Sequence, residues 1–188
     1  FMLTPMVGEA TPILIIDEFN TDQRTVDVPG AFENNNSSLA DAGVLGGVRD
    51  LSVQTKLVGA TTPQTTLQSE FGLLGFSNNV TATGRGFITY DGDFDPLTVD
   101  TTGLGGVNFL IGPNPFFNFD VVTFESDLDV TIRAWDMDGE LTTYFETLPP
   151  AGSFSPILPL TLFDNALFDW SRVGALQFEI ESNFVNYD

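Results

Sequence analysis

Short segments in which apolar and polar residues alternate recur along most of this chain. Residues 48–58, 128–135 and 173–180 follow a period of two, which is the pattern of a β-strand with one buried face. Alternation together with β-branched and aromatic residues predicts further strands at 13–19, 24–28, 69–76, 80–90, 107–111, 119–124 and 140–147. No long amphipathic helix is predicted, and residues 163–171 are expected to form a single helical turn at most.

Turn-forming residues separate these segments. Loops are expected at 30–41, 61–68 and 149–159, which are rich in Asn, Ser, Thr, Gln or Pro. Short strands with a turn about every 8 to 12 residues favour an all-β fold. The predicted fold class is a jelly-roll-like, two-sheet antiparallel β-sandwich, in which 18 phenylalanines fill the space between the sheets. We expect an apolar N-terminal arm at residues 1–12 and a single sandwich domain at residues 13–188.

The composition excludes most catalytic chemistry. The chain contains no Cys and no His, so thiol nucleophiles, Cys-ligated metal sites and Ser–His–Asp mechanisms are all ruled out. A hydrolase built on paired carboxylates stays open as an alternative. Glu179 alternates with Glu181 on one predicted strand, and Asp127 with Asp129 on another. With 26 acidic residues in the chain, such pairs also arise by chance, and we expect the protein not to be an enzyme.

The charge is strongly negative. The chain has 26 Asp and Glu against six Lys and Arg, which gives a net charge of −20. This charge repels phosphate backbones and anionic lipid surfaces, so no nucleic-acid or anionic-membrane partner is expected. No apolar stretch approaches the roughly 20 residues that span a bilayer. The single lysine, Lys56, is expected to form a salt bridge rather than a covalent crosslink.

Two acidic turns are candidate calcium sites. Their carboxylates belong to Asp91, Asp93, Asp95, Asp136 and Asp138. Ca²⁺ prefers several oxygen ligands from flexible acidic loops, but Asp and Gly also favour plain turns. No cofactor is required for the predicted fold, and a bound Ca²⁺ is one of the two possibilities at each turn.

A structural ion pair and four aromatic side chains complete the candidate residues. Arg49 is expected to form a fork-like pair with a nearby carboxylate, and Asp50 is the acid assigned to it. Aromatic rings stack on sugars where they are exposed and fill the core where they are not. The rings in question belong to Trp135, Trp170, Tyr90 and Tyr144.

Four short motifs carry a resemblance to a known family. They are IIDEFN at 15–20, GGVRDL at 46–51, GLGG at 103–106, and FDW followed by VGAL within 168–176. In this combination and order they resemble the β-sandwich ectodomain of PEP-CTERM-type exported bacterial proteins. The resemblance spans about residues 13 to 182. It implies a location outside the cell or at the surface of a bacterium, in association with surface display or extracellular matrix.

The function expected first is that of a secreted structural or adhesive protein. Residues 1–10 are either the remnant of a secretion signal or an arm that adds a strand to a neighbouring copy, giving a homo-oligomer or filament. The assembly residues of such an arm are Phe1, Met2, Leu3, Met6 and Val7. The alternative is a carbohydrate-binding module with a structural Ca²⁺, which requires exposed aromatic rings and a polysaccharide partner.

Overall fold

The protein is an all-β antiparallel sandwich, which confirms the fold class predicted from the sequence. The structure is a computed structural model. It describes residues 14–29, 35–57, 63–79, 82–118, 127–150 and 157–182. The proposed assembly residues Phe1, Met2, Leu3, Met6 and Val7 lie outside these described residues.

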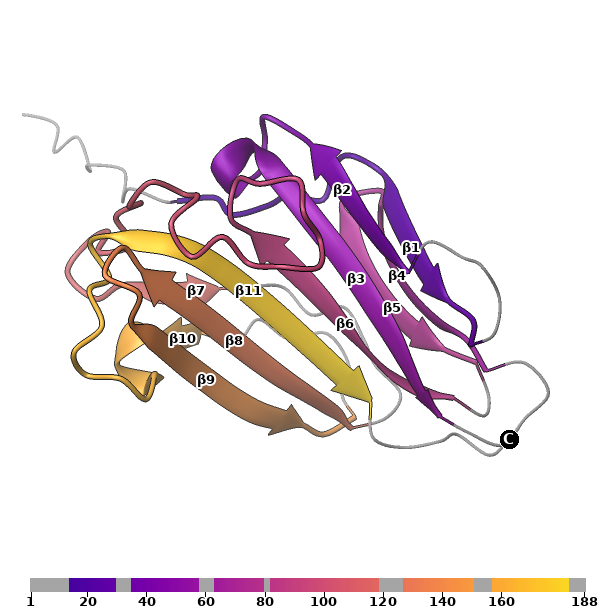
Figure 1. Cartoon of the computed structure of the whole chain (residues 1–188). Coiled ribbons are helices and arrows are strands. Elements are labelled where there is room, and N and C mark those ends of the chain that lie inside the picture. Colours follow the sequence, from indigo (N-terminus) through magenta and orange to yellow (C-terminus); the bar gives the residue numbers. More distant parts are fainter. Residues whose placement is uncertain are drawn as a thin grey trace, which may run out of the picture.

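One layer of the sandwich is a six-stranded antiparallel sheet with the order β2-β3-β6-β11-β8-β9. Its strands are β2 (Asn36–Ala40), β3 (Val48–Leu57), β6 (Thr83–Tyr90), β11 (Val173–Ser182), β8 (Leu128–Asp136) and β9 (Leu141–Leu148). Figure 1 shows this sheet nearest the viewer, with the other strands behind it. A short 3₁₀ turn, η1 (Leu45–Gly47), leads into β3.

The other layer consists of two small sheets, where the sequence predicted one. Their strands are β1 (Gln23–Asp27), β4 (Thr65–Glu70) and β5 (Leu73–Asn78) in the first, and β7 (Phe116–Asn118) and β10 (Ile157–Pro159) in the second. The first lies behind β2, β3 and β6, and the second behind β8, β9 and β11 (Figure 1). A second 3₁₀ turn, η2 (Leu160–Leu162), follows β10. It ends directly before residues 163–171, for which the sequence predicted one helical turn at most.

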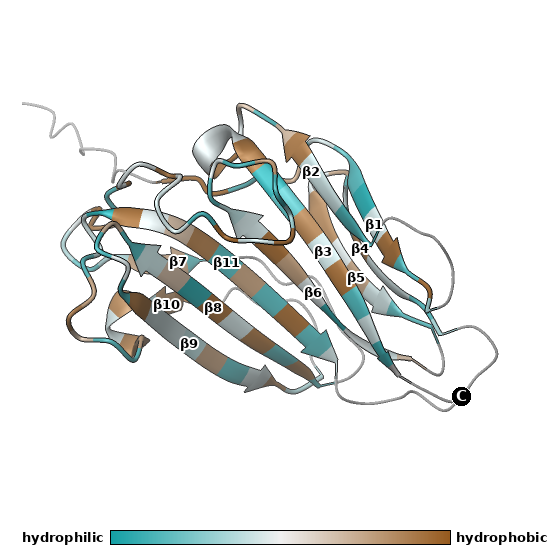
Figure 2. Ribbon diagram, in the orientation of Figure 1, coloured by the Kyte–Doolittle hydropathy of each residue, from teal (hydrophilic) through white to brown (hydrophobic). Residues whose placement is uncertain are grey.

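The core lies between the two layers and is built by alternation. Figure 2 shows apolar and polar residues taking turns along β8, β9 and β11. Leu51, Ile88, Ile132 and Leu176 point inward from four neighbouring strands and are almost completely buried. Burial of each such side chain contributes about 1.5–3 kcal/mol to stability, so the inward face of the six-stranded sheet is fixed.

An aromatic cluster closes the core behind β8 and β11. Trp170 packs edge-on against Phe163 and Phe168, with ring centroids 4.9 and 4.6 Å apart. Tyr144 also contacts Phe163, at 5.7 Å, and Tyr90 is buried. Three of the four aromatic residues considered as sugar platforms, Trp170, Tyr90 and Tyr144, are therefore engaged inside the protein.

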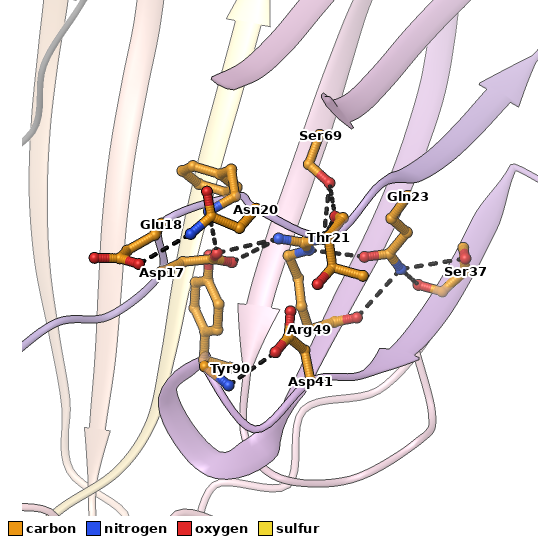
Figure 3. A network of polar contacts seen from close by, with 12 residues as sticks. Asp17, Glu18, Asn20, Thr21, Gln23, Ser37, Asp41, Arg49, Ser69 and Tyr90 are labelled. Atoms are coloured by element: carbon orange, nitrogen blue, oxygen red, sulfur yellow. Dashed lines mark hydrogen bonds and ion pairs between the residues drawn. The ribbon is translucent and has the colours of Figure 1, made fainter. Parts of the chain in front are cut away.

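A fully buried arginine at the start of β3 joins the two layers (Figure 3). The Arg49 guanidinium donates to the carboxylate of Asp17 (3.1 and 2.9 Å), to Gln23 Oε1 (2.8 Å), to Ser69 Oγ (2.7 Å) and to the carbonyl of Thr21 (2.6 Å). The partners come from the N-terminal segment, β1 and β4. All three nitrogens of the Arg49 guanidinium thus donate hydrogen bonds to groups inside the protein.

The network continues beyond the guanidinium. The Tyr90 hydroxyl donates to Asp17 at 2.9 Å, and burial raises the pKa of Tyr90 well above its usual value. The Gln23 amide donates to the carbonyl of Ser37, at 2.8 Å. Strands β1, β2, β3, β4 and β6 are therefore joined through one set of buried polar groups.

The carboxylate paired with Arg49 is that of Asp17 and not, as assigned from the sequence, that of Asp50. Successive side chains of a strand point to opposite faces. Arg49 points into the sandwich, and its neighbour in sequence points away from it. The correct partner was 32 positions away in the sequence, and nothing in the local sequence identifies it.

Several strand boundaries differ from the predictions. Residues 107–111, predicted as a strand, contribute one isolated bridge, at Val107. Residues 14–20 form no strand, although 13–19 was predicted as one. Asp17 turns toward Arg49, and Phe19 adopts a left-handed backbone conformation with φ of 53°. Conversely, β2 and β10 lie within segments that were predicted to be loops, and β4 begins in such a segment. Strands β2 and β4 have polar sequences and are held by backbone pairing with β3 and with β1 and β5.

Replacing Arg49 with Lys is expected to lower the free energy of unfolding by about 3 kcal/mol, because a buried ion pair loses its fork geometry. Urea unfolding followed by tryptophan fluorescence measures the effect. Arg24→Lys, at an exposed position of β1, is the matched control and is expected to change stability by less than about 0.5 kcal/mol. Equal effects of the two substitutions would show that the Arg49 network does not hold the layers together.

Candidate functional site

The face of the six-stranded sheet that points away from the core carries most of the candidate functional groups. We call it the outer face. Pairing between neighbouring strands places the side chains of this face in rows that cross the sheet. They are Asp50, Ser52, Gln54 and Lys56 of β3, Arg85, Phe87 and Thr89 of β6, Gln177, Glu179 and Glu181 of β11, Asp129, Thr131, Arg133 and Trp135 of β8, and Thr143, Phe145 and Thr147 of β9. Because the neighbouring residues point into the core, the register fixes this set.

One row of the outer face crosses five strands. It contains Ser52, Phe87, Glu179, Thr131 and Phe145, each paired with the next in the ladder. Phe145 is 60% exposed. Two aromatic rings therefore lie in the same row with polar side chains between them.

A cleft of about 200 Å³ lies on this face, under the loop of residues 91–106. Its floor is formed by Ser52, Phe87 and Gln177, and its wall by residues 96–99 of the loop. Leu97, in this wall, is 74% exposed. The loop crosses in front of β11, β6 and β3 (Figure 1). The cleft thus combines an aromatic ring, an exposed aliphatic side chain, an amide and hydroxyl groups.

A second cavity differs in chemistry. It has a volume of about 340 Å³ and lies over β1 and β4. Its lining is formed by Asp22, Gln23, Arg24, Gln68, Ser69 and Glu70. No aromatic ring contributes to that lining, and Gln23 and Ser69 are already engaged with Arg49.

The loop over the first cleft is tied down by buried Asp91. Its two carboxylate oxygens accept the backbone N–H groups of Asp93 (3.1 Å) and Asp100 (2.9 Å). A Cβ on Gly103 would lie 1.8 Å from the Asp91 carbonyl oxygen, so only glycine allows the chain to return this closely. Desolvation on burial raises the pKa of Asp91. These contacts hold both ends of the loop.

The same loop brings together the motifs noted in the sequence. A Cβ on Gly46 would meet Leu104 at 2.4 Å, and one on Gly174 would meet the carbonyl of Thr101 at 2.1 Å. The N–H of Leu104 donates to the carbonyl of Gly174 at 2.9 Å. The segments 46–51, 103–106 and 173–176 therefore form one packed junction. Close backbone approach requires glycine at positions 103 and 174 of this junction.

The second acidic turn has a similar structural role. Oδ1 of buried Asp136 accepts the N–H groups of Asp138 (2.9 Å) and Glu140 (3.0 Å), and Oδ2 accepts that of Asp169 (3.1 Å). Asp138 is exposed and forms an ion pair with Arg172 at 3.1 Å. In the part of the chain that the structure describes, no three acidic side chains are grouped so as to hold a metal ion. Calcium binding at either turn stays a prediction.

Three of the acids considered as catalytic pairs, Glu179, Glu181 and Asp129, lie on the outer face, and each is engaged with a cation or a hydroxyl group. Glu179 accepts from Arg133 at 2.6 Å and lies 3.8 Å from Arg85. Glu181 forms an ion pair with Lys56, as expected for the single lysine. Asp129 accepts a hydrogen bond from the Thr147 hydroxyl at 2.6 Å. None of these contacts resembles two facing acids that share a substrate, which a glycosidase requires.

Asp50 is the unusual acid of the outer face. It is 2% exposed, and neither of its carboxylate oxygens has a hydrogen-bond partner among the described residues. Burial raises its pKa to about 6, the nearby Ser38 hydroxyl offsets part of the shift, and the negative charges of Asp91 and Asp93 add to it. A buried, unpartnered carboxylate destabilises the folded state when it is ionised.

Asp50→Asn is expected to stabilise the protein at neutral pH. The raised pKa means that the folded state binds the proton more tightly, so the wild type loses stability as the pH rises from about 4 through about 6. The loss reaches about 3 kcal/mol, and it is absent from the variant. Urea unfolding at pH 4, 5, 6 and 7 measures it, with Asp22→Asn at an exposed position as control. A parallel pH profile of wild type and Asp50→Asn would contradict the expectation.

Several residues of this site were not singled out from the sequence. Phe87 and Gln177 lie on predicted strands, but alternation alone does not tell which face of a strand is outward. Residues 96–99 carry no motif. Trp135, which was considered as a sugar platform, does lie on the outer face and is half-buried.

No protein-family model and no curated protein matches this sequence. Among solved structures, the chain is similar to the family 11 carbohydrate-binding module of a cellulosomal cellulase of Clostridium thermocellum, with 13% identity and a TM-score of 0.30. The match covers 86% of this chain and 92% of that module. Within the described residues, no helix is long and apolar enough to cross a membrane.

Proposed function

We propose that this protein is a non-catalytic polysaccharide-binding module, exported to the surface of a bacterium or beyond it, and that it binds through the outer face. The observation that carries the proposal is the cleft between Phe87, Gln177 and Leu97. A sugar ring has apolar C–H faces and a rim of hydroxyl groups. It therefore fits a site that offers a ring and an aliphatic side chain for the faces and an amide and hydroxyls for the rim.

Binding without catalysis agrees with the chemistry of the cleft. Its lining, as far as the structure describes it, contains no carboxylate, lysine or tyrosine. Of the acids elsewhere on the outer face, Glu179 and Glu181 are held by cations. Asp129 accepts a hydrogen bond from the Thr147 hydroxyl, and Asp50 is buried. Hydrolysis of a glycosidic bond needs a proton donor and a second carboxylate beside the bond, and this cleft supplies neither.

The extracellular location rests on the resemblance of four motifs to exported bacterial proteins. The net charge of −20 keeps such a protein dispersed and free of nucleic acid. Calcium would serve as a structural ion in an acidic turn and is not needed for the proposed binding.

A structural or adhesive role through self-association is the second candidate. Strand β5 is the last strand of its sheet in the described part of the chain, so its outer edge can accept an added strand. In the turn before this strand Phe71 is 86% exposed, and Leu73 on the strand is also exposed. Homo-oligomer or filament formation by the apolar N-terminal arm would cover these side chains.

Phe87→Ala is expected to weaken polysaccharide binding at least tenfold, because an aromatic anchor at the centre of a binding site contributes about 2 kcal/mol or more and about 1.4 kcal/mol corresponds to a factor of ten. Affinity electrophoresis through gels that contain single polysaccharides measures the effect. Phe71→Ala removes an exposed ring from the opposite layer and is the matched control, with unchanged binding expected. Thermal unfolding of both variants checks that the fold is intact.

Two results would contradict the proposed function. One is a wild-type protein that is retarded by none of a broad set of neutral and acidic polysaccharides. The other is equal retardation of wild type and Phe87→Ala on the polysaccharide that binds. In the first case, size-exclusion chromatography of the full chain and of a chain lacking residues 1–12 would test self-association.

A further inference from the structure

We infer that the ligand is an uncharged, linear polysaccharide, held as a stretch of several sugar units that lies across the strands from the cleft to Phe145. The inference rests on the proposed function and specifies its ligand. Two independent features of the outer face carry it: the pairing of its charges and the alignment of its aromatic rings.

The outer face gathers half of the chain's cations. Lys56, Arg85 and Arg133 lie on it, out of six Lys and Arg in a chain with a net charge of −20. A cluster of cations in so acidic a protein would ordinarily indicate an anionic ligand. Whether these cations can bind an anionic ligand depends on the groups with which they are already paired.

Each of the three cations lies beside a carboxylate of the protein itself, and two of them share the same one. Arg133 donates to Glu179 at 2.6 Å, and Arg85 lies 3.8 Å from the same residue. Lys56 pairs with Glu181. An acidic sugar would have to break these pairs and approach against the charge of the whole chain. The electrostatics of this face therefore favour a ligand without charge.

The groups left to meet a ligand are mostly neutral. Ser52 and Gln177 line the cleft, and Thr131 lies in the same row as Phe87 and Phe145. Gln177 is oriented by donating to Thr89 at 3.0 Å. Hydroxyl and amide groups exchange hydrogen bonds with sugar hydroxyls in either direction. Such groups recognise neutral sugars without requiring a charged substituent.

The spacing of the rings sets the size of the ligand. Phe87 on β6 and Phe145 on β9 occupy the same row and are separated by β11 and β8. Neighbouring strands lie about 4.8 Å apart, so the two positions are about 14 Å apart. A single sugar ring cannot reach both. A chain of several sugars laid along the row contacts Phe87 in the cleft and Phe145 near the far edge.

The direction of the ligand follows from the same row. A chain running along a strand would meet only one of the two rings. A chain running across the strands passes Phe87, Glu179, Thr131 and Phe145 in order. Glu179 is buried and held by Arg133, so it offers a neutralised surface at the middle of the path.

Isothermal titration calorimetry of the wild-type chain tests the inference. The probes are cello-, xylo- and manno-oligosaccharides of one to six units and oligogalacturonides of matched lengths, each in 50 mM and 500 mM NaCl. We expect at least one neutral series to bind with an affinity that rises tenfold or more from two to six units. The affinity is expected to change less than twofold between the two salt concentrations.

Substitutions of single aromatic residues show which of them causes the gain in affinity with oligosaccharide length. Phe145→Ala is expected to abolish the gain in affinity with length, while binding of the two-unit sugar stays within twofold of wild type. Phe116→Ala, an exposed ring on β7 in the opposite layer, is the control and is expected to keep the gain. Phe87→Ala is expected to weaken all lengths.

The outcomes separate the inference from the proposed function. Tightest binding to oligogalacturonides, weakened by salt, would overturn the inference and leave polysaccharide binding in place. An affinity independent of length, or a gain that survives Phe145→Ala, would also overturn it. Failure of every oligosaccharide and every polysaccharide to bind would overturn both.

Discussion

The buried ion pair between Arg49 and Asp17 is the interaction on which the arrangement of both layers depends. A guanidinium with no exposed surface is stable only when its donors are satisfied, and the network around it uses groups from five strands and the N-terminal segment. Removal of one partner leaves an uncompensated charge in the core. The pair therefore determines more than local stability, because it sets how the β1-β4-β5 sheet sits behind β3 and β6. The position of the outer face follows from it.

The loop that forms the cleft is built by a different constraint. Glycines at 103 and 174 allow backbone segments to approach where any Cβ would clash, and Gly46 leaves room for the Leu104 side chain. The carboxylates of Asp91 and Asp136 bind backbone N–H groups and close their turns. The cleft wall is therefore held in place before any ligand arrives, which lowers the entropic cost of binding. Asp91 and Asp136, which the sequence suggested as calcium ligands, bind backbone N–H groups of their own loops in this structure.

The sequence predicted the central strands well because they are half-buried and alternate. The predictions at 48–58, 128–135 and 173–180 correspond to β3, β8 and β11. Strand β2 and most of β4 were missed because their polar sequences give no alternation, and their pairing is decided by neighbouring strands. In the described part of the predicted strand at 13–19, Leu14 and Ile16 pack on the core, but the segment forms no strand. The candidate site was less predictable, since the row that joins Phe87 to Phe145 exists only through a ladder register that spans the chain.

Backbone chemical-shift mapping tests the central claim most directly. The ¹⁵N-labelled protein is titrated with a soluble neutral oligosaccharide of six units, of the series that it binds best, and its assigned amide signals are followed. Polysaccharide binding at the outer face predicts that the largest shifts occur at Ser52, Phe87, Leu97 and Gln177. Shifts concentrated on β1, β4 or β5, or no shifts at saturating concentrations, would contradict binding at this face.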